Sequence, residues 1–202
     1  RDAVGFFSAS SAPNPKKHSG KRSLPMNTQC QLSIVTKKYL ACYDCILQDM
    51  IQGMTQARLT GSISHNFIVQ MIPHHQAAIE MSQNLLQYTT CIPLQEIALS
   101  IISEQTQSIE NMQRILPQCG TCTNCAQSLE GYRRRVSQIL ETMFIQMKEA
   151  CSDNRINANF MREMIPHHRG AVQMSRNALQ YEICSGLRPI LEAIISSQEK
   201  GI

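Results

Sequence analysis

The sequence predicts an all-α fold in which two copies of one helical unit pack into a single bundle. The first observation is a repeat: residues 31–109 align with residues 124–202 at a constant offset of 93, without a gap. Between residues 63–91 and 156–184, 16 of 29 positions are identical. The second observation is composition. The chain has no tryptophan and only 5% aromatic residues, so its core must be built from Ile, Leu, Met and Ala, which favour helices.

Each copy contains three segments with helical periodicity. The predicted helices span residues 31–57, 63–89, 93–115, 124–150, 156–182 and 187–200. Gly61 and Asn154 are expected in turns, and Pro93 and Pro189 near the first turn of a helix, where proline is tolerated. The domain organisation is therefore a tail (1–28), a first repeat (29–118) and a second repeat (119–202), with both repeats in one bundle domain.

The net charge of +4 lies in the tail. Residues 1–28 contain five Lys or Arg and one Asp, whereas residues 29–202 contain 14 basic and 14 acidic side chains. The body is therefore not expected to bind nucleic acid, and no apolar run is long enough for a membrane span. The tail is rich in Ser, Pro, Gly and Lys. Two hypotheses remain open for it: it packs on another chain, in a homo-oligomer or filament, or it lies along its own bundle.

The strongest chemical pattern is Met-Ile-Pro-His-His, which occurs once in each repeat and is followed by a further methionine. At 100° per residue these methionines and histidines share one face of a helix. Thioethers are soft ligands and imidazoles suit copper, so the pattern predicts a metal site for Cu(I), with Ag(I) as a mimic. The candidate ligands are Met71, His74, His75, Met81, Met164, His167, His168 and Met174.

A plainer interpretation is that the methionine stripe packs the core and the histidines are hydrogen-bonded there. The same choice applies to four further methionines, for which core packing is the preferred interpretation: Met50, Met54, Met143 and Met147. Pro73 and Pro166 either kink these helices or mark their first turns.

Nine cysteines indicate an oxidising compartment, so we expect a secreted, extracellular or periplasmic protein. Cys91 and Cys184 are equivalent in the repeat. The closely spaced cysteines at 42 and 45, and at 119, 122 and 125, fit either structural disulfides, which we favour, or a metal or redox site. Pairing cannot be deduced from spacing, and the odd count leaves one cysteine over.

The motif Phe-x₃-Met-Ile-Pro-His-His-x₂-Ala-x₂-Met, present twice, resembles a secreted bacterial family catalogued as domain of unknown function three hundred and five. The resemblance covers about residues 60–202. It implies a ferritin-like four-helix core, to which this chain adds an N-terminal helix and the extended tail. It also implies copper binding by the eight residues named above. Acidic residues that often precede the family's phenylalanine are replaced here by His65-Asn66 and Ala158-Asn159, which argues against a carboxylate-assisted site.

The sequence thus predicts a copper-binding or sequestering protein without catalysis. The alternative is a structural subunit of an extracellular oligomer or filament, in which the metal sites are secondary or vestigial. A carboxylate-bridged redox enzyme is disfavoured because the chain has no Glu-x-x-His pair.

Overall fold

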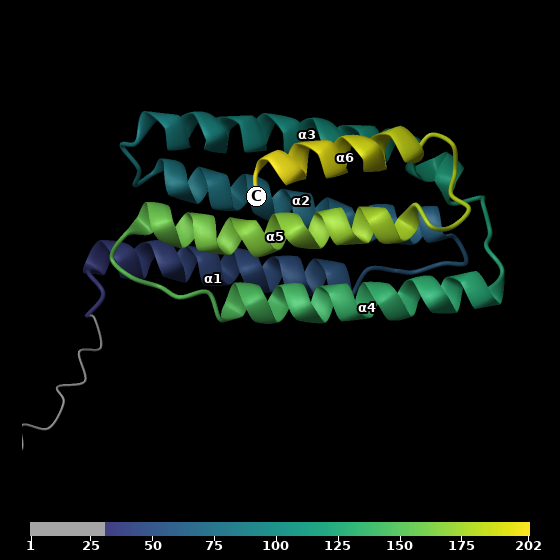
Figure 1. The fold of residues 1–202 in the computed structure, drawn as a ribbon, viewed down its shortest axis with the longest axis horizontal. Coiled ribbons are helices and arrows are strands. Elements are labelled where there is room, and N and C mark those ends of the chain that lie inside the picture. The colour runs from purple at the N-terminus through teal and green to yellow at the C-terminus, as the bar shows by residue number, and fades with distance from the viewer. Residues whose placement is uncertain (1–30) are drawn as a thin grey trace, which may run out of the picture. The chain divides into compact units, whose positions relative to one another are not determined.

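The computed structural model describes residues 31–202, which form an all-helical bundle (Figure 1). Within this range there is no strand. The helices are α1 (Ile34–Thr55), α2 (Ile63–Leu86), α3 (Ile92–Cys119), α4 (Ala126–Lys148), α5 (Ile156–Ala178) and α6 (Arg188–Lys200). All of the predicted helices are therefore confirmed, and their ends differ from the predicted ones by four residues at most.

A closed ring of four helices forms the core of the bundle. Helix α2 packs against α3 and α5, and α6 packs against α5 and α3. Helices α2 and α5 run antiparallel through the middle (Figure 1). Helix α1 packs outside the ring on α2, and α4 packs in the equivalent place on α5. The predicted four-helix core with an added N-terminal helix is thus observed, and α4 is a second helix outside the ring.

Both histidine-bearing helices continue through their prolines. Pro73 lies inside α2 and Pro166 lies inside α5. The alternative that these helices begin at the proline is therefore wrong. Helix α2 begins at Ile63, eleven residues before His74, and its cap residue is Ser62, whose hydroxyl accepts a hydrogen bond from the His65 amide. The motif consequently lies in the middle of each helix, at the centre of the bundle.

The turn before each of these helices is closed by an asparagine. The Asn66 side chain accepts from the Thr60 amide at 2.7 Å and donates to the Thr60 carbonyl at 3.0 Å. In the second repeat Asn159 makes the same pair of bonds with the backbone of Asp153, at 3.1 and 2.7 Å. Asn66 and Asn159 therefore fix the entry of the chain into α2 and α5.

In the part of the chain that the structure describes, one disulfide joins the end of α3 to the segment before α6. Cys119, at the end of α3, is bonded to Cys184, which precedes α6. The hydroxyl of Ser62 donates to the Cys119 carbonyl at 2.7 Å, and the Cys184 amide donates to the Ser64 hydroxyl at 2.9 Å. The expected disulfide is therefore present, but the other described cysteines have free, exposed thiols: Cys42, Cys45, Cys91, Cys122, Cys125 and Cys151. A disulfide favours an oxidising compartment.

Gly53 on α1 marks the closest approach of that helix to α2. A Cβ atom at this position would lie 2.7 Å from Cβ and 3.3 Å from Cγ of the rigid Pro73 ring. We expect Gly53→Ala to lower the free energy of unfolding by about 1–2 kcal/mol, because the clash outweighs the gain in helix propensity. Urea denaturation would measure this. Gln146→Ala, at the equivalent and exposed position of α4, should leave stability almost unchanged; equal effects of the two changes would contradict the explanation.

Two sequence-based hypotheses concern residues outside the described range. The extended tail (1–28), and the homo-oligomer or filament that it would support, are not addressed by residues 31–202, and the same holds for Cys30. Among the described helices, none combines the length and apolar character needed to cross a membrane.

Candidate metal centre

The structure buries all eight candidate ligands in the middle of the bundle. The exposed fraction of each of these side chains is 3% or less. Those of α2 are Met71, His74, His75 and Met81, and those of α5 are Met164, His167, His168 and Met174. The prediction that both motifs face inward is confirmed. Because α2 and α5 pack on each other, the two motifs meet, at His74 and His167.

His74 and His167 lie against each other where the two repeats meet. Their rings are stacked, with centroids 3.6 Å apart and planes inclined by 26°. His74 Nε2 is 3.1 Å from the carbonyl oxygen of His167, and His167 Nε2 is 3.0 Å from the carbonyl oxygen of His74. This reciprocal pair relates the two repeats by an approximate twofold axis, as the duplication predicts.

These hydrogen bonds fix the protonation of both rings. A carbonyl oxygen only accepts, so Nε2 of His74 and of His167 must carry the proton and donate it. In a neutral imidazole the other nitrogen, Nδ1, then has a free lone pair. Nδ1 is buried and has no hydrogen-bond partner in all four histidines of the two motifs. Buried polar atoms without partners are rare in proteins and point to a missing ion or water.

Burial keeps the four imidazoles neutral. It lowers the pKa of His75 to about 3 and that of His168 to about 4, with neighbouring imidazoles adding to the effect for His75. It also lowers the pKa values of His74 and His167 well below the usual value of 6.5, again reinforced by other rings of the cluster. A metal must displace a proton from a charged imidazole but not from a neutral one, so the histidines are ready to bind a metal at neutral pH.

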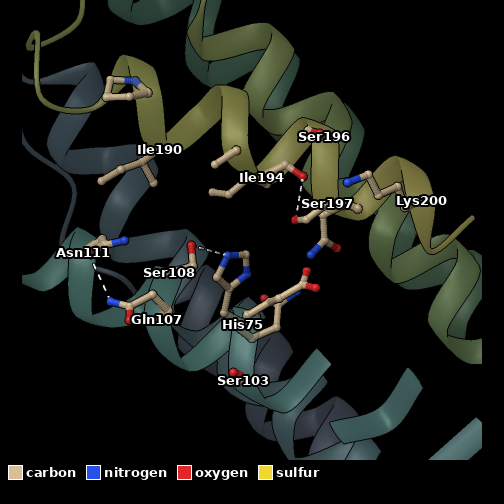
Figure 2. Close-up of a pocket in the computed structure, with 15 residues that line it drawn as sticks. His75, Ser103, Gln107, Ser108, Asn111, Ile190, Ile194, Ser196, Ser197 and Lys200 are labelled. Atoms are coloured by element: carbon tan, nitrogen blue, oxygen red, sulfur yellow. Dashed lines mark hydrogen bonds between the residues drawn. The ribbon is translucent and has the colours of Figure 1, made fainter. Parts of the chain in front are cut away.

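We call His75 and His168, the second histidine of each motif, the outer histidines. The outer histidine of the first repeat, His75, reaches a cavity between α3 and α6. Figure 2 shows His75 pointing from α2 into this space, which has a volume of about 790 Å³. Its Nε2 is 3.0 Å from the hydroxyl of Ser108 on α3. The equivalent of Ser108 in the second repeat is Gly201, which packs against the edge of His168 and offers no hydroxyl. The outer histidines of the two repeats therefore differ in their surroundings.

A buried carboxyl group lies next to the second motif. Glu163, one residue before Met164, is 2% exposed and accepts a hydrogen bond of 2.6 Å from the Tyr39 hydroxyl. Burial raises the pKa of Glu163 to about 7, and Asp44 adds to the rise while the Tyr39 bond opposes it. Its equivalent, Gln70, donates instead to the Met54 carbonyl at 3.3 Å. Sequence reasoning did not assign these residues a role, although the Glu-for-Gln difference between the repeats was a usable signal.

Histidine, cysteine, aspartate and glutamate side chains alone do not form a metal site in the described residues. In residues 31–202 no group of three or more His, Cys, Asp or Glu side chains is arranged to hold one ion. A site made from this cluster must therefore include methionine sulfur together with imidazole nitrogen. That ligand set fits a soft monovalent ion, because Cu(I) accepts thioether and imidazole ligands at low coordination number.

The extra methionines of the outer helices also lie in the core. Met50, Met54, Met143 and Met147 are each 2% exposed or less. Their positions agree with core packing, which was the preferred interpretation of these residues.

Comparison with known proteins places the chain in a family. No curated protein and no solved structure matches it. One family model, described as Domain of unknown function (DUF305), matches residues 47–116 and again residues 64–202. The match begins further toward the N-terminus than the motif alone indicated and includes the last part of α1, from residue 47 onward. Because the two matched segments together span most of the chain and contain both His-His motifs, this protein belongs to the DUF305 family.

Proposed function

We propose that this protein binds and sequesters copper as Cu(I), without catalysis, at the cluster where α2 and α5 meet. The observation that carries the proposal is the set of four buried imidazoles, each with an unpartnered Nδ1 atom. The lone pairs of these nitrogens and the thioethers on the same helix faces form one buried set of soft and borderline donors.

The residues that would hold the ion are the histidines and methionines of the two motifs. When bound, Cu(I) would replace the missing hydrogen-bond partners of Nδ1 and so remove the cost of burying these atoms. The surrounding apolar core, including Phe67 and Phe160, leaves each of these side chains no more than 3% exposed. A largely desolvated site favours Cu(I) over the more strongly hydrated Cu(II), and Ag(I) should bind as a mimic.

The setting that suits this function is outside the cytoplasm, in a secreted or periplasmic protein. The Cys119–Cys184 disulfide supports this proposal, because disulfides persist mainly in oxidising compartments.

The test is a Cu(I) titration of the metal-free protein against a competing chromogenic chelator. Met71, Met81, Met164 and Met174 are changed together to leucine, which keeps the apolar volume of the core but removes the thioethers. We expect this variant to bind Cu(I) more weakly by about 100-fold, while a His75→Gln, His168→Gln double variant should also bind more weakly.

The matched control changes two buried methionines outside the motif, Met54 and Met147, to leucine. This control should bind Cu(I) within about threefold of the unaltered protein, since leucine replaces methionine with little disturbance of the core. Circular dichroism and thermal unfolding would show that all variants are folded. Unaltered protein that cannot compete with the chelator, or a four-methionine variant that binds equally well, would contradict the proposal.

A further inference from the structure

Helix α5 carries a third methionine that the motif does not include. Met161 stands three residues before Met164 and seven before His168, so the three lie within about 60° of one helix face. All three line one cavity of about 410 Å³, bounded by α5, α3 and α6. Met161 is 48% exposed at the solvent side, whereas Met164 and His168 are buried. Two thioethers and an imidazole therefore lie along one wall of this cavity, from its solvent side toward the buried cluster.

Gly201 lies against the Nε2 edge of the His168 imidazole, where a residue with a side chain would not fit. A Cβ atom at Gly201 would lie 2.6 Å from His168 Nε2, so any larger residue would displace the ring or the chain. In the first repeat the equivalent nitrogen, Nε2 of His75, is engaged by Ser108. In the second repeat Nδ1 of His168 is also buried without a hydrogen-bond partner.

The first repeat cannot form the same arrangement. The residue equivalent to Met161 is Ile68, which has no sulfur and is fully buried. The cavity at His75 is lined by neither Ile68 nor Met71, and no thioether is among its lining residues, which include Ser108, Gln107 and Asn111. The combination of soft ligands and solvent access therefore belongs to the second repeat alone.

The charged side chains that line this cavity are one acid and one base, Glu104 and Lys200. Glu104 of α3 lines the cavity and accepts a hydrogen bond of 2.8 Å from Ser100. Lys200 lines it as well, so the site is balanced in charge rather than strongly acidic. Such a site would hold a soft monovalent ion better than a hard divalent one, because thioethers are poor ligands for Mg²⁺ or Ca²⁺.

We propose that Met161, Met164 and His168 form a solvent-accessible site for Cu(I) or Ag(I), which is present only in the second repeat and shares Met164 and His168 with the buried cluster. The proposal rests on the proposed function in one respect, which is that the protein handles a soft monovalent metal. It adds a ligand outside the Met-His-His-Met motif and makes the two halves of the duplicated fold unequal in metal binding.

The test uses the full chain with ¹³C-labelled methionine methyl groups, observed by NMR during addition of Ag(I). Single substitutions assign the signals, and Met161→Ile supplies the residue that the first repeat has at this position. We expect the methyl signals of Met161 and Met164 to shift with Ag(I). In Met161→Ile, Ag(I) binding at this site should weaken by about tenfold, while the response of Met71 and Met81 is retained.

The possible results separate this proposal from the proposed function. If the Met161 signal does not move while Met71 and Met81 respond, the accessible site is overturned and the buried cluster stands. If Met161 and Met164 respond but Met71 and Met81 do not, the accessible site is supported and the buried cluster fails. If no methionine signal responds, both are overturned. Because Met161 is half-exposed, Met161→Ile should fold normally, which the unchanged signals of the other methionines would show.

Discussion

Mild acid is expected to unfold the metal-free protein, with most of its stability lost between about pH 6 and pH 4. Four buried histidines have pKa values lowered below 6.5, to about 3 for His75 and about 4 for His168. In the unfolded chain the same groups take up protons near pH 6.5, so below this pH the unfolded state binds more protons than the folded state. Stability is therefore fully present above pH 6.5 and is lost as the pH falls.

The size of the loss of stability in acid follows from the number of buried histidines. Each group contributes about 1.4 kcal/mol per pH unit, so four contribute about 5 kcal/mol per pH unit, against a total stability of roughly 5–15 kcal/mol for a typical domain. Urea denaturation at several pH values between 7.5 and 5 would measure the slope. A free energy of unfolding that stays constant over this range would contradict the prediction. His168→Gln should reduce the slope by about a quarter.

Glu163 changes the stability with pH in the opposite direction to the histidines. Its pKa is raised from the ordinary value to about 7, so the folded state binds the extra proton. Its contribution to stability is present at low pH and is lost as the pH rises from about 4.5 to 7. It therefore partly offsets the histidines in this window. Glu163→Gln, which copies Gln70 of the first repeat, should make the loss of stability in acid steeper.

Removal of the disulfide is expected to lower the free energy of unfolding by about 4 kcal/mol, because Cys119 and Cys184 close a loop of the unfolded chain between residues 65 positions apart. The bond also ties the end of α3 and the segment before α6 to the beginning of α2, through Ser62 and Ser64. The measurement is urea denaturation of the Cys119→Ala, Cys184→Ala double variant, beside the unaltered protein with and without reductant.

The control for the disulfide is a pair of cysteines nearby in sequence. Cys122 and Cys125 are exposed free thiols, so changing both to serine should alter stability by no more than about 0.5 kcal/mol. Reductant should destabilise this control as much as the unaltered protein and should leave the Cys119, Cys184 variant unaffected. A reductant effect of equal size in all three proteins would argue against the Cys119–Cys184 pairing.

The repeat and the helical period were enough to predict the fold and the inward orientation of both motifs. The fold and this orientation follow from the spacing of residues along the chain. Met71, His74 and Met164 accordingly lie on the buried faces that this spacing predicts. The contact of His74 with His167 was not predictable in the same way, because it depends on how α2 crosses α5. Helix periodicity identifies a face, but it does not identify the residue of the partner helix that the face meets.

The positions at which the two repeats differ in sequence give His75 and His168 different surroundings. The pairs Ser108 and Gly201, and Ile68 and Met161, look like ordinary divergence in the sequence. In the structure they decide which outer histidine has a hydroxyl neighbour and which lies in a cavity with an exposed thioether. The pairing of Cys119 with Cys184 was not predictable either, because the spacing of nine cysteines along a chain does not determine which of them form disulfides.

The reciprocal contact of His74 and His167 makes the surface between the repeats self-complementary, as in an isologous dimer. Two separate subunits joined in this way would dissociate on dilution. Here the segment between α3 and α4 and the disulfide hold the two halves at a high effective concentration. The association of the halves, and any ligand set that both halves supply, is therefore independent of protein concentration.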